Sequence, residues 1–365
     1  MKTLSVFNNK GGVGKTTLTF HIGHVLAAMG HPTLFIDLDP QCNLTICGMD
    51  TESLHKIWEK EDAFVDDFES ARKAASQTDF DNLIQEPRSI HFIVKPTEDG
   101  TGELERLPPP VKLANNLGLL PGRLTMHMFE DKISSRWSQV YSGDPQAIRT
   151  AAKIRHVAAE YAKQYGYEYV IFDTSPSLSM MNKIIISTTD GFLIPCMPDM
   201  FSLYGIRNIG KALQHWKREF ETISRLLSDE KRKNFPETFV KFIGYTIYNA
   251  KRYANTNEWD LAQGSYGYAK QIPQTIQSYI TPELRANISE ATLAEPVGGT
   301  AIMHGHNTFP GMAQKYHVPI WDVPSAQREP EDVAGVAGQR QAYEATKANY
   351  TAFATDLISR MNSLT

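Results

Sequence analysis

The sequence predicts an α/β fold in which a doubly wound, mostly parallel β-sheet carries helices on both faces. The first 40 residues alternate as an apolar strand, a glycine-rich turn, a helix and a second strand, which is the order of a right-handed βαβ unit. Several later apolar runs are unbroken rather than alternating, as in parallel strands that are buried on both faces. With 365 residues, the chain is long enough for one large domain of this kind.

The predicted elements follow one another in a regular order. Strands are expected where short apolar runs occur, at 3–7, 33–36, 117–121, 169–172, 191–195, 239–248 and 318–323. Helices are expected where apolar residues recur three and four positions apart, at 16–29, 147–165, 202–227 and 339–362. Two stretches interrupt this order, at about 50–115 and 252–316. We interpret residues 1–365 as one domain with these two insertions.

Both insertions carry weak structural signals. In the first, residues 95–103 and 108–110 are rich in Gly, Pro and Thr or in Pro alone, which predicts loops. The second is rich in Gly, Asn, Tyr and Thr and predicts an irregular lobe outside the sheet.

Composition excludes several classes of protein. With 41% hydrophobic and 21% charged residues, the chain has the balance of an ordinary globular protein. No apolar run approaches the roughly 18 residues that a membrane-spanning helix needs, and the N-terminus enters a strand without a secretory leader. The three cysteines form no CxxC pair, which argues against a disulfide framework or a zinc knuckle. We therefore expect a cytoplasmic location.

A phosphate-binding loop is predicted at Lys10–Thr17, where KGGVGKTT stands between a strand and a helix. Glycines let backbone N–H groups close around phosphates without Cβ clashes, and the N-terminus of the following helix favours anions. Lys15 is expected to contact the β- and γ-phosphates and the Thr16 hydroxyl to ligate Mg²⁺. The residues expected to bind the nucleotide here are Gly11, Gly12, Val13, Gly14, Lys15, Thr16 and Thr17.

Two departures from the general phosphate-loop pattern point to one family. Asn9 stands where that pattern has glycine, and a second lysine, Lys10, opens the loop. Taken alone, Lys10 is also compatible with a solvated loop lysine. The whole motif is a deviant Walker A sequence and resembles that of the ParA/MinD family of P-loop ATPases. The resemblance implies an ATP-bound sandwich homodimer, in which Lys10 reaches the partner subunit's nucleotide and neutralises charge on the transferred phosphoryl group.

Two acidic motifs extend this resemblance. FIDLDPQ at 35–41 is similar to the second family motif, which implies that Asp39 orients the attacking water while Asp37 lies beside the Mg²⁺ shell. YVIFDTSPS at 169–177 is similar to the Walker B segment, which implies that Asp173 holds Mg²⁺ through water. Ser175 departs slightly from the family's usual Asp-Thr-Pro-Pro. Ligands of open α/β sheets lie at the C-terminal ends of strands, where these carboxylates fall.

The expected nucleotide is ATP. Residues 244–249 are followed by Ala-Lys-Arg, not by the Asn-Lys-x-Asp pattern that reads guanine in GTPases. By position, Asn249 resembles the family's adenine contact, and the loop after Pro324 is expected to close the other side of the base. The resemblance covers residues 1–48, 117–251 and 318–362.

The family resemblance implies a switch whose ATP-bound dimer binds a surface and whose hydrolysis releases it, for plasmid or chromosome partition or cargo positioning. A ParB-like or other activating protein is the expected partner. A membrane-bound relative would need a basic amphipathic C-terminal helix, but 351–365 holds a single basic residue, Arg360. An iron–sulfur carrier would need paired cysteines, and a dethiobiotin-synthetase-like ligase is not expected to combine Lys10 with the DLDPQ segment. An alternative is the ATPase subunit of another assembly, such as a phage-defence system, that docks a partner through the insertions.

Non-specific DNA is the expected surface. Residues 50–106 carry a net charge of −8, whereas residues 201–253 carry +6, and such a split marks either a contact with an anionic partner or two solvated faces. Non-specific DNA binding needs several phosphate contacts rather than a base-reading motif. The candidate contacts are Arg207, Lys211, Lys217 and Arg218, with Arg225, Lys231, Arg232 and Lys233 further along the chain.

Overall fold

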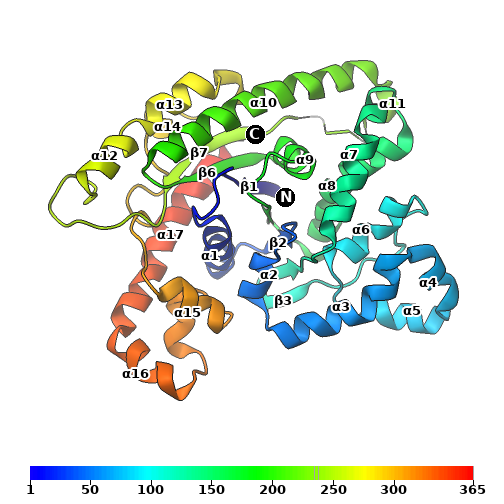
Figure 1. The fold of residues 1–365 in the computed structure, drawn as a ribbon, viewed down its shortest axis with the longest axis horizontal. Helices are drawn as coiled ribbons and strands as arrows, with labels where there is room; N and C mark the ends of the chain where they lie inside the picture. Colours follow the sequence, from blue (N-terminus) through cyan, green and yellow to red (C-terminus); the bar gives the residue numbers. More distant parts are fainter. Residues whose placement is uncertain (234, 237, 365) are drawn as a thin grey trace.

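The computed structural model describes residues 1–233, 235–236 and 238–364. A seven-stranded sheet runs through this part of the chain in the order β3-β4-β2-β5-β1-β6-β7. β3 pairs antiparallel with β4, and the other neighbours pair in parallel. The strands are β1 (Lys2–Val6), β2 (Thr33–Asp37), β3 (Val111–Ala114), β4 (Leu117–Leu120), β5 (Tyr169–Asp173), β6 (Gly191–Cys196) and β7 (Lys241–Ile247). The predicted doubly wound fold is confirmed (Figure 1).

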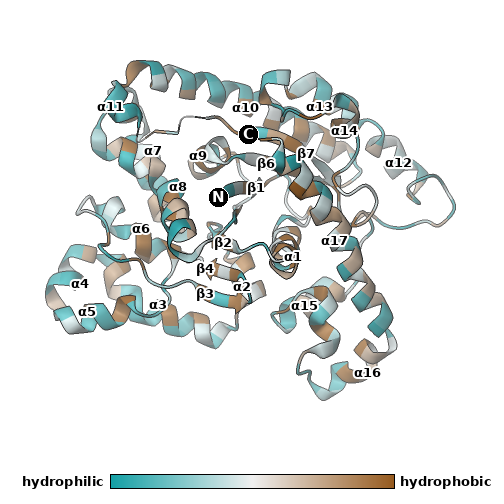
Figure 2. Ribbon diagram, turned by 180° about the vertical axis from the view of Figure 1, so that it is seen from behind, coloured by the Kyte–Doolittle hydropathy of each residue, from teal (hydrophilic) through white to brown (hydrophobic). Residues whose placement is uncertain are grey.

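Helices cover both faces of this sheet because successive strand residues point to opposite sides. On β2, Leu34 and Ile36 pack into the apolar cluster that also holds α8 and α9, whereas Phe35 packs with α1 and α17 on the other face. In Figure 2 the apolar residues lie on the strands and inner helix faces, while much of α10 is hydrophilic. The helices predicted from the sequence are α1 (Lys15–Ala28), α8 (Pro145–Tyr165), α10 (Met200–Leu226) and α17 (Arg340–Asn362).

The sequence patterns do not predict the remaining helices. They are α2 (Asn43–Gly48), α3 (Thr51–Asp66), α4 (Phe68–Ala74), α5 (Gln77–Ile84), α6 (Ile90–Asp99), α7 (Met126–Tyr141), α9 (Met180–Thr188), α11 (Asp229–Arg232), α12 (Gln263–Ala269), α13 (Ile272–Tyr279), η1 (Pro282–Leu284), α14 (Glu290–Ala294), α15 (Phe309–Lys315), η2 (Ile320–Ser325) and α16 (Pro330–Gly338). Among the described residues, no helix combines the length and hydropathy that crossing a bilayer requires.

The first insertion is largely helical, and the predicted loop at 95–103 is wrong in its first half. Residues 95–99 belong to α6, although Pro96 lacks the N–H that an interior helical residue donates. Burial overrides this cost, because α6 packs its apolar residues into the cluster on the α8 face of the sheet.

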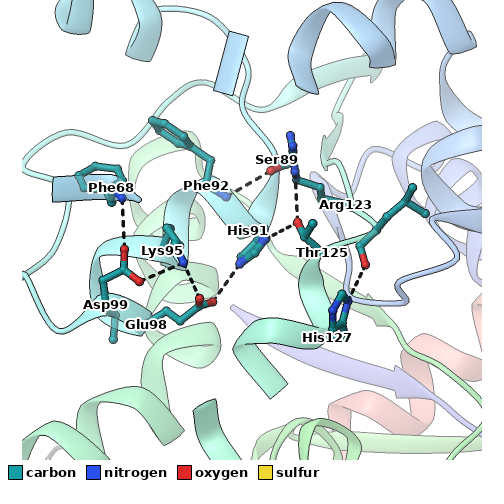
Figure 3. Close-up of polar contacts among 12 residues, drawn as sticks. Phe68, Ser89, His91, Phe92, Lys95, Glu98, Asp99, Arg123, Thr125 and His127 are labelled. Carbon is teal, nitrogen blue, oxygen red and sulfur yellow. Dashed lines mark hydrogen bonds and ion pairs between the residues drawn. The ribbon is translucent and has the colours of Figure 1, made fainter. Parts of the chain in front are cut away.

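A buried polar network also holds α6 (Figure 3). His91 is hydrogen-bonded to Thr125 at 2.6 Å and to Glu98 at 2.9 Å, and Lys95 pairs with Glu98 at 2.7 Å. These contacts fix the helix against the segment that leads into α7.

Two expectations for the C-terminal half are corrected. Residues 252–316 are not irregular throughout but contain α12, α13, η1, α14 and α15. They also follow the outer edge of the sheet, because the Ala286 and Val297 amides donate to carbonyls of β7. The strand expected at 318–323 is absent from the described sheet; η2 lies there instead, since Pro319 and Pro324 supply no N–H for a strand ladder. The interpretation as one domain with two insertions stays a prediction.

Candidate nucleotide site

The phosphate-binding loop lies between β1 and α1, at the C-terminal edge of the parallel strands. Gly12 and Gly14 adopt positive φ angles of 74° and 79°, which glycine reaches without steric cost. An added Cβ on Gly14 would lie 2.4 Å from Cε1 of Tyr248, so the loop also rests on that ring. Gly14 precedes the first turn of α1, whose free N–H groups favour an anion.

A cavity of about 310 Å³ opens over this loop. Lys15 and Asp39 line it, and both are largely buried. Burial lowers the pKa of Lys15, while the nearby charges of Asp173 and Asp39 act in the opposite direction. The other lining residues are Gly11, Gly12, Gly14, Thr16, Thr17, Asn43, Cys47, Pro176 and Gln314. Lysine and backbone amides therefore face the same space as a carboxylate.

Two of the predicted carboxylates lie side by side at neighbouring strand ends, and one of them contacts Thr16 of the cavity wall. Asp37 ends β2 and Asp173 ends β5, and the two residues are partners in the parallel register. The Thr16 hydroxyl donates to Asp173 Oδ2 at 2.8 Å, whereas the buried Asp173 Oδ1 has no hydrogen-bond partner among the described residues. Burial raises the pKa of Asp173 well above its usual range, and the neighbouring Asp37 charge adds to this effect. A cation bound here would lower the free energy of the ionised Asp173 carboxylate.

Asp37 is fixed by the helix that follows it. Its Oδ2 accepts hydrogen bonds from the Thr45 amide at 2.8 Å and from the Thr45 hydroxyl at 2.6 Å. Burial raises the pKa of Asp37 to about 7, although the bonds from Thr45 oppose that shift. Asp39, two residues later, accepts from the Gln41 amide at 2.9 Å and keeps its place on the cavity wall.

The donor set fits Mg²⁺ bound mainly through a nucleotide. In the described part of the chain, no three His, Cys, Asp or Glu side chains are arranged as a metal site of their own. Mg²⁺ in phosphate sites typically takes one or two protein oxygens together with phosphates and water. The Thr16 hydroxyl and the open oxygen of Asp173 match that pattern.

The Lys10 side chain contacts the beginning of α10. Its Nζ forms an ion pair with Asp199, the residue that caps α10, and lies 5.7 Å from the ring centroid of Phe201. No sequence pattern indicates this contact, because the two charged residues are 189 positions apart.

The predicted base contacts are separate from the phosphate cavity. Asn249 follows Tyr248, the residue beneath Gly14, and lines a second cavity of about 880 Å³ together with residues 300–301 and 304–307. Pro324 is buried within η2 and lines neither of these two cavities. The structure brings Asn249 near the loop but does not bring Pro324 to the same wall.

Five of the predicted basic residues lie along α10: Arg207, Lys211, Lys217, Arg218 and, in its last turn, Arg225. Arg207, Lys211 and Arg218 recur at intervals of four and seven on the face opposite the buried residues of the helix. Arg207 stacks on Tyr279, and Lys217 pairs with Glu221 at 2.9 Å.

The later basic residues are engaged differently. Lys231 donates to the Gly143 carbonyl, and Arg232 to the carbonyls of Ser224 and Leu227. These two residues thus fasten α11 to its neighbours rather than extending the row on α10.

Sequence reasoning missed some residues of the cavity. Asn43 and Cys47 come from α2, and Gln314 comes from α15 about 300 positions after the loop. Asn43 could have been suggested by its position two residues after the DLDPQ segment. No local signal marks Gln314, because it reaches the cavity through the packing of α15 against α2, which is distant in the sequence.

A strand–loop–helix phosphate cradle with carboxylates at two adjacent strand ends defines a P-loop nucleoside triphosphatase. A family model described as an AAA domain matches residues 1–101 and 110–225, well over half of the chain. The chain belongs to this family, the P-loop ATPases of the ParA/MinD type.

Relatives and solved structures agree with this assignment. The sporulation initiation inhibitor protein Soj of Bacillus subtilis is 25% identical over 57% of this chain, and the match spans 63% of Soj. The Cyanothece McdA–ATP complex superposes with a TM-score of 0.57 at 17% identity, covering 98% of this chain and 96% of McdA. The pNOB8 ParA bound to nonspecific DNA gives 0.54 at 18% identity, with 99% and 98% covered. At these identities the structural likeness shows the fold.

Proposed function

We propose that this protein is a ParA-like switch that hydrolyses Mg²⁺-ATP, forms an ATP-dependent homodimer, binds non-specific DNA as a dimer and leaves it after hydrolysis. Such a cycle would serve plasmid or chromosome partition or the positioning of another cargo. The observation that carries the proposal is that Lys15, Thr16 and Asp39 line one cavity over the phosphate loop, while Asp173 is hydrogen-bonded to the Thr16 hydroxyl at 2.8 Å.

The ligand roles follow from the donors. Lys15 and the loop amides would hold the β- and γ-phosphates, and Thr16 with Asp173 would hold Mg²⁺. The ion, when bound, neutralises charge on the phosphates. Asn249 would contact the adenine from the larger cavity, and the loop after Pro324 would approach the other side of the base.

Asp39 would orient the attacking water, because its carboxylate lies on the cavity wall and is held there by the Gln41 amide. The Asp39→Ala variant should bind ATP normally and hydrolyse it slowly, whereas Lys15→Ala should weaken binding itself. Both are measured with a Mg²⁺-dependent ATPase assay and a nucleotide titration. Normal turnover in the Asp39→Ala protein would show that Asp39 does not orient the attacking water.

The dimer part of the proposal rests on Lys10, which a partner's nucleotide would draw across the interface. Light scattering should show a shift from monomer to dimer with ATP but not with ADP. Lys10→Ala should hydrolyse ATP poorly. A dimer that forms regardless of nucleotide would locate the interface in the insertions and leave the trans role of Lys10 without support.

The DNA part rests on the basic row of α10, in which Lys211 and Arg218 are exposed and Arg207 is half-buried. A dimer would carry two such rows, so ATP would raise avidity without any new contact. Binding should fall steeply with salt and vary little with DNA sequence. A mobility shift with unrelated duplexes at two salt concentrations, with ATP and with ADP, tests this. A triple variant, in which Glu replaces Arg207, Lys211 and Arg218, should lose DNA binding. If the triple variant still binds DNA, the row is only a solvated face.

A second candidate is the ATPase subunit of another assembly, such as a phage-defence system, with a partner protein docked on the first insertion. The observation that favours it is a hydrogen-bond chain from that insertion to the site. Trp58 Nε1 donates to the Gly122 carbonyl at 3.1 Å, the Gly122 amide donates to the Thr45 hydroxyl at 2.8 Å, and that hydroxyl donates to Asp37.

The genes that flank this one separate the two candidates. A neighbouring gene for a small centromere-binding protein favours partition, and one for a nuclease or toxin favours defence. The purified product of that gene should then stimulate ATP hydrolysis, and Trp58→Ala should reduce the stimulation if the partner docks on α3.

A further inference from the structure

Lys10 is held within its own subunit by a contact that no part of the ATPase cycle described above requires. Its ammonium pairs with the Asp199 carboxylate, and the two side chains are only 23% and 34% exposed. Phe201, two residues after Asp199, presents its ring to the same ammonium at 5.7 Å from the centroid. The lysine therefore has two partners in the monomer, and both come from the first turn of α10 or its cap.

Asp199 is well placed to hold a cation. Its Oδ1 accepts a hydrogen bond from the Ser202 amide at 2.9 Å, and this bond caps α10. The other carboxylate oxygen, Oδ2, accepts from Lys10. Partial burial alone would raise the pKa of Asp199, but the hydrogen bonds from Lys10 and the Ser202 amide keep it below its usual value. The carboxylate is thus ionised at neutral pH.

The phosphate loop and the start of α10 are also packed together, and each of them carries one partner of the ion pair. The Lys10 amide donates to the Asn8 side chain at 3.0 Å, and a Cβ on Gly205 would meet the Asn8 and Asn9 side-chain oxygens at 3.0 Å. Glycine at position 205 therefore allows α10 to approach the beginning of the phosphate loop.

We propose that Asp199 is a positioning residue that retains Lys10 in the monomer and must release it before Lys10 can reach the partner subunit's nucleotide. This inference rests on the trans role of Lys10 in the proposed function. The γ-phosphate is the group that would compete for the ammonium. ADP has no γ-phosphate and therefore cannot compensate for the loss of the Lys10–Asp199 ion pair. The ion pair thus helps to restrict dimerisation to the ATP state.

The size of the effect follows from the exposure of the pair. A partly exposed ion pair changes an equilibrium by about two- to fivefold. Because each dimer releases two such pairs, the dimer dissociation constant with ATP should fall by about four- to 25-fold when the carboxylate is neutralised.

The test uses the full chain with Asp39→Ala, which keeps ATP intact, and sedimentation over a range of protein concentrations with Mg²⁺-ATP. Asn is a good helix cap, so Asp199→Asn removes the charge and keeps the cap of α10. It should dimerise at lower protein concentration and begin to dimerise with ADP. Asp199→Glu keeps the charge and should restore the parent's behaviour. Circular dichroism of each variant verifies that α10 is intact.

A Lys10→Ala background separates the possible causes. There, Asp199→Asn should have no further effect on dimerisation. If Asp199→Asn fails to tighten the dimer, or tightens it equally without Lys10, the inference is wrong. A different result would contradict the proposed function: the Lys10→Ala protein would dimerise and hydrolyse ATP as the unaltered protein does.

Discussion

Replacing Gly14 with alanine tests the geometry of the phosphate loop most sharply. At φ 79° an L-residue costs about 1–2 kcal/mol. The new Cβ would also lie 2.4 Å from Tyr248 Cε1, and that ring is buried with its hydroxyl bonded to Tyr350 at 2.9 Å. Overpacking of this kind adds about 1–3 kcal/mol, so the whole loss is about 2–5 kcal/mol.

The loss can be measured as a change in Tm. With an unfolding entropy of about 2.1 cal/mol/K per residue, the expected decrease in Tm is about 3–6 °C for a chain of 365 residues. Because the loop must move away from Tyr248, affinity for a fluorescent ADP analogue should fall at least about tenfold, a change worth 1.4 kcal/mol.

Gly166→Ala is the matched control for Gly14→Ala. Gly166 has φ 74° at the end of α8, and a Cβ there meets nothing within 4 Å. This variant should lose only the backbone part, about 1–2 kcal/mol, and bind nucleotide normally. If the two variants lose equal stability and both keep nucleotide affinity, Tyr248 does not support the loop as described.

Two further predictions concern buried polar contacts. Arg123→Ala leaves the fully buried Glu61 without its cation, which is 2.9 Å away, and should destabilise the protein by about 3–5 kcal/mol in thermal unfolding; adding Glu61→Gln should recover most of the loss, and no recovery would refute the pairing. Burial lowers the pKa of His21 to about 4, and its Nε2 accepts from the Ile320 amide at 3.1 Å. The unfolded chain binds a proton at His21 below about pH 6.5, so this contribution to stability is lost as pH falls from about 6.5 to about 4. The Tm difference between pH 7 and pH 5 should therefore be smaller in His21→Gln, and an equal difference would contradict it.

Local patterns sufficed for the core strands and the phosphate loop. Lys15 and Thr16 belong to a short motif whose geometry depends on neighbouring residues, and Asp37 and Asp173 each end an apolar strand. Since parallel strands end at the same edge, strand order alone brings the two carboxylates together.

The parts that could not be predicted depend on distant contacts. Pro96 and its neighbours predict a loop from local sequence alone. The apolar cluster into which α6 packs holds this segment in a helix. Residues 318–323 have the apolar character of a strand, yet two prolines and the bond from Ile320 to His21 favour η2. The ion pair between Lys10 and Asp199 joins residues that no short window contains.

The most direct test of the account is single-turnover hydrolysis, with protein in excess over ATP so that slow turnover is still resolved. The unaltered protein should convert bound ATP to ADP in the presence of Mg²⁺. Asp39→Ala should bind ATP with the same affinity and hydrolyse it about 10²–10⁴-fold more slowly, the usual contribution of a positioned acid or base. Hydrolysis at the same rate in both proteins, or none in the unaltered protein, would contradict the assignment of this site as an ATPase centre built on Asp39.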